Sequence, residues 1–73
     1  MPAWFKPVFS SLLSEVGWDP GNEELTVTFA KNGKTAAYKG FDEGTALSLS
    51  HAPSAGQMFL REIKPFASAW RYV

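Results

Sequence analysis

The sequence of 73 residues contains no cysteine and a single histidine, His51. The lack of cysteine excludes disulfide bonds and thiolate metal sites. A single histidine excludes a metal site built from several histidines. No apolar run approaches the roughly 18 residues that a membrane-spanning helix needs, and residues 1–16 lack the long apolar segment of a signal peptide. We therefore expect no cofactor, no membrane contact and a cytoplasmic location.

The chain also has little charge of either sign in excess, since seven basic residues balance seven acidic ones. A strongly basic, non-specific nucleic-acid binder is excluded, whereas a local basic patch is not. No Gly-x-Ser-x-Gly elbow and no phosphate-binding glycine series is present. The acidic pairs at 23–24 and 42–43 are explained by a solvated strand entrance and a helix cap. We expect a non-enzymatic protein without a small-molecule substrate.

The chain is rich in apolar residues: 45% of its residues are hydrophobic and 15% are aromatic. This content is enough for the hydrophobic core of one small domain over residues 1–73. Leu25, Val27 and Phe29 alternate with threonines, which is typical of a half-buried strand. Asn32-Gly33 predicts a tight hairpin turn with positive φ at both residues. A second strand then returns over residues 34–41.

Residues 12–18 fit either a helix or a strand, because their apolar positions match both periods. The turn signal at residues 19–22 stands directly before the central hairpin and favours a strand, which would complete an antiparallel three-stranded meander. Residues 1–8 contain two prolines and are expected to form an extended arm. Its Trp4-Phe5 pair would either cover the core or face a partner.

Two short helices are predicted after the meander. Asp42 is expected to cap a helix over residues 43–51 that buries Ala46, Leu47 and either Leu49 or Ser50. Pro53 ends this helix. A Ser54–Gln57 capping box starts a second helix, which Pro65 ends. Its apolar residues are expected to face the core, and these are Ala55, Met58, Phe59 and Ile63.

The tail, residues 66–73, alternates again and predicts a C-terminal strand with Trp70 inward. Six basic residues are the candidate nucleic-acid contacts: Lys31, Lys34, Lys39, Arg61, Lys64 and Arg71. Cations beside exposed rings suit phosphates and stacked bases. Turn lysines also keep sheet edges soluble, and this second explanation stays open. The solvent-side cations Arg61, Lys64 and Arg71 are the preferred phosphate contacts.

The segments SSLLSEVGWD, LTVTF, AYKGF, LSLSHAPSAGQMF and REIK, in this order, resemble the KTSC domain over residues 9–66. This family is a short module that occurs alone in bacterial and phage-related proteins and at the C-terminus of some lysyl-tRNA synthetases. Its Tyr-x-Tyr motif falls here on Ala36 and Tyr38, and its Tyr-Phe pair falls on Met58 and Phe59. Asp42 stands where the family often has proline.

The resemblance implies a strand rather than a helix over residues 12–18, and a β-β-β-α-α order before the last strand. The expected fold is α+β: the meander, two short helices and a C-terminal strand, curling into a small open barrel similar to Sm-like or SH3-like modules. The company of a synthetase implies RNA as a partner. The alternative is a protein-interaction module that forms homo-oligomers through a strand edge without binding nucleic acid.

Overall fold

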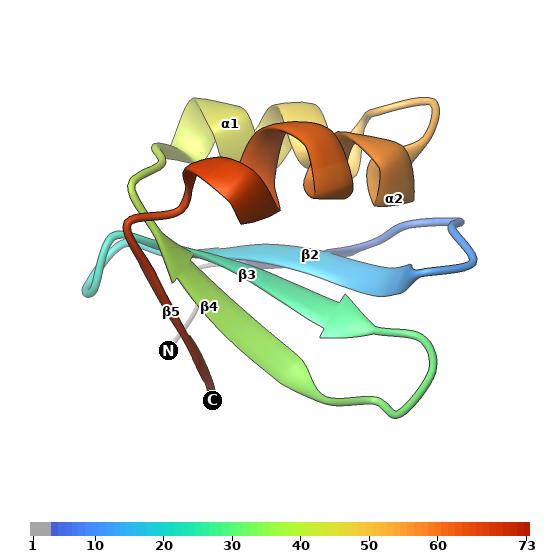
Figure 1. Ribbon diagram of the computed structural model, residues 1–73, viewed down its shortest axis with the longest axis horizontal. Coiled ribbons are helices and arrows are strands. Elements are labelled where there is room, and N and C mark those ends of the chain that lie inside the picture. The colour runs from blue at the N-terminus through green and yellow to red at the C-terminus, as the bar shows by residue number, and fades with distance from the viewer. Residues whose placement is uncertain (1–3) are drawn as a thin grey trace.

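The computed structural model describes residues 4–73 and arranges them in two layers, an antiparallel sheet and a layer of helices on one of its faces (Figure 1). The strands lie in chain order across the sheet: β1 Trp4–Pro7, β2 Leu13–Asp19, β3 Glu24–Phe29, β4 Thr35–Lys39 and β5 Ala69–Tyr72. The second layer contains α1 Glu43–Ser50, α2 Ala55–Met58, the π-helical turn η1 Phe59–Ile63 and the 3₁₀ turn η2 Lys64–Phe66. No helix in the described part of the chain is long and apolar enough to span a membrane.

The predicted three-stranded meander is wrong by one strand, because part of the expected arm forms β1. Trp4 lies opposite Trp18, and Pro7 lies opposite Glu15. Proline is tolerated there because β1 is an edge strand. Trp4 packs on the core, and its indole Nε1 donates to Glu43 at 2.9 Å, so this ring covers the core. Residues 1–3 of the predicted arm lie outside the described residues.

The predicted curled barrel is replaced by an open sheet, since within the described residues β1 and β5 are its two edges and do not pair with each other. The strand predicted over residues 12–18 is confirmed as β2, one residue later along the chain, and it pairs with β3 with one irregularity between Leu13 and Glu15. Leu25 and Val27 face the helices and are fully buried, as their alternation predicted. Phe29, at the end of β3, is only partly buried.

The turn between β3 and β4 differs from the predicted tight hairpin. Gly33 has a φ of 71°, but Asn32 is not among the described residues with positive φ. The chain makes a longer loop over residues 30–34, which the Phe29 N–H closes by donating to the Lys34 carbonyl at 2.8 Å. Asn32 contributes its side chain instead, since its Oδ1 accepts from the Lys34 N–H at 3.0 Å.

The first helix begins as predicted. The Asp42 carboxylate accepts from the backbone N–H of Thr45 at 2.8 Å, and this bond lowers the pKa of Asp42 below its ordinary value of 3.8. Ala46 and Leu49 are buried, whereas Leu47 is exposed, so the prediction for Leu47 is wrong. The side of α1 that faces the sheet is determined by Ala46 and Leu49, which lie three residues apart, and Leu47 therefore points away from the core.

The second helical segment starts at Ala55 without the predicted capping box, because Ser54 makes no side-chain hydrogen bond to the first turn. Instead the backbone carbonyl of Ser54 accepts from the Met58 N–H at 3.1 Å. Phe59 and Ile63 are buried, as predicted. Because they lie four residues apart, both side chains fall on the face of this segment that packs on the sheet, and Phe59 is the largest fully buried side chain.

Candidate nucleic-acid interface

A row of aromatic rings runs from the core to the surface along β4 and β5. Buried Phe59 meets the edges of Phe29 and Tyr38, with ring centroids 5.8 Å and 5.3 Å away. Tyr38 stacks on Trp70 at 6.1 Å with an interplanar angle of 20°, and Trp70 meets Tyr72 edge-on at 5.2 Å. The register explains the row, because Tyr38 lies opposite Trp70 across the two strands.

The outer end of this row is open to solvent. Trp70 and Tyr72 are each 56% exposed, although alternation places both on the helix-bearing face, as the tail pattern predicted. The inward packing expected of Trp70 is therefore only partial, because β5 is the edge strand and all four of its residues are exposed. The two rings border an open hollow of about 260 Å³, together with Phe29, Tyr38 and Lys64.

One of the six predicted cations lines this hollow, and a second lies beside one of its rings. The Lys34 Nζ lies 5.4 Å from the centroid of the Tyr72 ring, within the range of a cation–π contact. Lys64, in η2, is one of the residues that line the hollow. Burial, and to a lesser extent Tyr72, raises the pKa of Tyr38, so its phenol stays neutral at physiological pH. The positive charge in the lining comes from Lys64, and Lys34 adds a second charge beside Tyr72.

We call Trp70, Tyr72, Lys34 and Lys64 the ring platform. Three other predicted cations, Lys31, Lys39 and Arg61, are not part of the platform. Lys31 is exposed in the β3–β4 loop, and Arg61 is exposed on η1. Lys39 lies opposite Ala69, so the alternation along β4 directs its side chain to the helix-free face of the sheet.

Arg71 corrects the expectation of a solvent-side cation available for phosphate. Its Nε and Nη2 donate to the two carboxylate oxygens of Glu24, at 3.2 Å and 2.9 Å. The Arg71 side chain is 55% exposed, but that of Glu24 is only 1% exposed, so Glu24 is no solvated strand entrance. The hydrogen bonds, and then the charge of Glu24, raise the pKa of Arg71.

This ion pair has a structural consequence for the ring platform. The four residues of β5 are all exposed, so burial alone holds this strand weakly. The bidentate pair joins β5 to β3 across β4, on the face opposite to Trp70 and Tyr72. Arg71 is therefore a positioning residue for the two rings. No local pattern in the sequence indicates this pair, because its members lie 47 positions apart.

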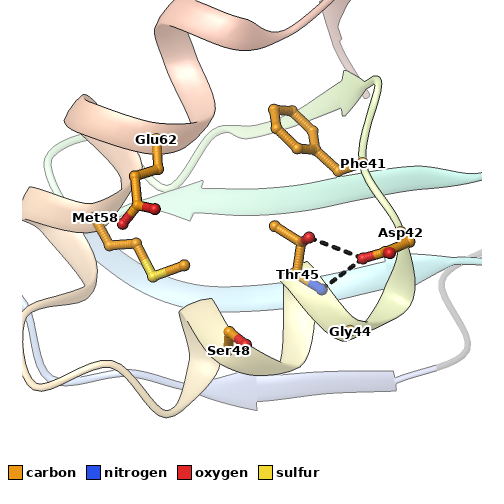
Figure 2. Close-up of a pocket in the computed structure, with 7 residues that line it drawn as sticks. All are labelled: Phe41, Asp42, Gly44, Thr45, Ser48, Met58 and Glu62. Atoms are coloured by element: carbon orange, nitrogen blue, oxygen red, sulfur yellow. Dashed lines mark hydrogen bonds between the residues drawn. The ribbon is translucent and has the colours of Figure 1, made fainter.

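Another hollow, about 530 Å³, lies between α1 and the second helical segment. Figure 2 shows that Asp42 and Glu62 both border it, and that the Asp42 carboxylate is engaged by Thr45. Two carboxylates without a facing cation in this lining disfavour phosphate. Within residues 4–73, no three acidic or histidine side chains are gathered as a metal ion would require.

Fold and site together define a small α+β module with an exposed pair of rings on its last strand. Comparison with known proteins identifies the family. The KTSC domain family matches residues 9–66, and the crystal structure of a KTSC domain protein from Yersinia pestis is 31% identical, covers 96% of each chain and superimposes with a TM-score of 0.81. No curated protein matches the chain. The chain belongs to the KTSC domain family.

Proposed function

We propose that this chain is a non-enzymatic binding module that holds single-stranded RNA on the ring platform. The observation that carries the proposal is the meeting of two half-exposed rings with two ammonium groups from separate segments of the chain. Rings of this kind stack on bases of any sequence, and neighbouring cations attract the phosphates between them. A cytoplasmic location is part of the proposal, because single-stranded RNA is available there.

The size of the hollow decides what it would hold. Pockets for whole small molecules begin at roughly 300 Å³, and this hollow measures about 260 Å³ and is open. It suits one flat ring system, such as a single base, with the sugar and phosphate left outside. Lys34 and Lys64 flank the rings, so each is placed to meet a phosphate next to the stacked base.

The alternative nucleic-acid ligand is a double helix, and the platform disfavours it. Bases in a duplex are stacked on each other, so their faces are not offered to Trp70 and Tyr72. The net charge of zero also gives little long-range attraction to a dense phosphate backbone. The proposal does not rest on a likeness to Sm-like or SH3-like barrels, because the described sheet is open and a fold analogy does not by itself establish a function.

The proposal is tested by fluorescence anisotropy with a labelled single-stranded RNA and the same RNA annealed to its complement. We expect the single strand to bind more tightly. Two phosphate contacts predict a slope of log affinity against log salt of about −1.4, since each contact contributes about −0.7 on a single strand. A slope of zero, or preference for the duplex, would refute the platform as the site.

Matched variants separate the platform from general charge. The double variant Lys34→Ala, Lys64→Ala should lose most of the salt dependence, whereas Lys31→Ala and Arg61→Ala, which also remove two exposed cations, should retain it. An equal loss in both pairs would mean that the affinity comes from overall charge. Circular dichroism of each variant checks that the fold is intact.

A further inference from the structure

The last strand leaves one edge of the sheet open, and this edge lacks the usual protection against pairing. In the described residues β5 pairs with β4 alone. Natural edge strands are protected by lysine, proline or a bulge, and β1 at the other edge has both Lys6 and Pro7. β5 has Arg71 as its one charged residue, and Glu24 holds that guanidinium on the helix-free face.

The hydrogen-bonding pattern shows which backbone groups the open edge offers. The Val73 N–H donates to the Thr35 carbonyl of β4 at 2.9 Å. Because hydrogen bonding alternates along an antiparallel strand, Arg71 also turns its N–H and C=O toward β4, and Trp70 and Tyr72 turn theirs away. Donors and acceptors at this spacing match another extended strand of polypeptide.

We propose that β5 pairs antiparallel with β5 of a second copy of this chain. The register follows from the outward groups: Trp70 would exchange hydrogen bonds with Tyr72 of the second copy, and Tyr72 with its Trp70. Arg71 would then lie opposite its own counterpart on the two-fold axis. Such an isologous interface is self-complementary and closes at a dimer.

Two observations favour a second copy as the occupant. First, the chain has zero net charge, so two copies do not repel each other over a distance. Second, like charges directly opposite on paired strands are destabilising, and the pair with Glu24 neutralises the Arg71 side chain that would face its counterpart. The aromatic cross-strand pairs of Trp70 with Tyr72 add favourable contact.

The geometry has a consequence for the ring platform. A two-fold axis perpendicular to a continuous sheet leaves the same face of both copies on one side. The rings of Trp70 and Tyr72 from both copies would therefore lie side by side and lengthen the surface on which bases stack. This consequence rests on the proposed function, whereas the pairing itself requires no RNA.

Sedimentation equilibrium without RNA tests the pairing. Over a concentration series we expect the mean mass to rise from the 8.0 kDa of one chain toward twice that value and no further. A mass that stays at 8.0 kDa at every concentration would refute the pairing, and growth beyond the dimer would refute the closed register. RNA binding by a strict monomer would leave the proposed function intact and refute this inference alone.

Cysteine cross-linking tests the register, and the chain offers a clean background because it has no cysteine. In the proposed register Ala69 lies opposite Val73 of the second copy, in a non-hydrogen-bonded pair about 4.5 Å apart at Cα, which a disulfide spans. Both residues are exposed. A mixture of the Ala69→Cys and Val73→Cys variants should give disulfide-linked dimers of mixed composition. Equal cross-linking within either variant alone, or none in the mixture, would overturn the register.

Discussion

Replacement of Phe59 by alanine should be the most damaging single truncation in the row of rings. Phe59 is 1% exposed and contacts two other rings, those of Phe29 and Tyr38. Truncating a buried phenylalanine costs about 3–5 kcal/mol through lost transfer energy and the cavity left behind. A domain of this length has a total stability of about 4–11 kcal/mol, at about 0.05–0.15 kcal/mol per residue. The variant should therefore keep little of its stability.

Phe29→Ala is the matched comparison, because it removes the same ring from a partly exposed site on the same row. We expect a loss of about 1–3 kcal/mol, below the range for a fully buried ring. Urea denaturation followed by circular dichroism measures both variants, and Phe59→Leu serves where Phe59→Ala does not fold. Equal losses for Phe29→Ala and Phe59→Ala would refute the reasoning, since burial would then not determine the cost.

Three further tests concern other parts of the structure. Arg71→Ala should lower the thermal midpoint more than Glu24→Gln does. Arg71→Ala leaves a buried carboxylate without its partner, whereas Glu24→Gln leaves a cation that water can reach. The reverse order would contradict the assigned burial. The pKa of Asp42 is lowered, so the stability that its carboxylate adds is complete above the ordinary value of 3.8 and is lost as pH falls through the lower folded value. In thermal melts across this pH range, Asp42→Asn should remove that part of the acid sensitivity. An unchanged pH profile would argue against the cap. Gly17→Ala should lower the thermal midpoint and displace β1, because a Cβ there would lie 2.8 Å from the Trp4 carbonyl, whereas Gly21→Ala, with its nearest contact at 3.4 Å, should be tolerated.

Local patterns predicted the elements whose formation depends on neighbouring residues. The alternation of Leu25 and Val27 placed the central strand and its core-facing residues correctly, although the expected half-buried strand also buries Thr26 and Thr28 on its other face. The position of Asp42 located the start of α1. In both cases the period or the cap acts within a few residues. The Asn32-Gly33 signal located a turn but not its length, because the conformation of the loop also depends on where β4 pairs with β3.

The remaining features depend on contacts between distant parts of the chain. Trp4 joins a strand because Trp18 lies opposite it. The two nearby prolines instead favour an extended arm when the sequence is considered locally. Glu24 reads as a solvated residue, since buried glutamates are rare, until Arg71 arrives from the last strand. The sequence predicts rings beside cations, but of the preferred cations Arg61, Lys64 and Arg71 only Lys64 lies in the ring platform. The residues that meet there depend on which side chains surround β5 at the edge of the sheet.

The central claim is that RNA stacks on Trp70, and the three tryptophans of the chain provide their own controls. Trp18 is buried, and the Trp4 indole is hydrogen-bonded to Glu43. In a nitrogen–proton NMR titration with single-stranded RNA, we predict that the indole signal of Trp70 moves while those of Trp4 and Trp18 stay in place. Trp70→Ala should weaken binding by about 5- to 150-fold, equivalent to about 1–3 kcal/mol for one stacked base, whereas Phe9→Ala, which removes a fully exposed ring outside the platform, should not. A Trp70 signal that does not respond to RNA, or affinity unchanged in Trp70→Ala, would contradict the account.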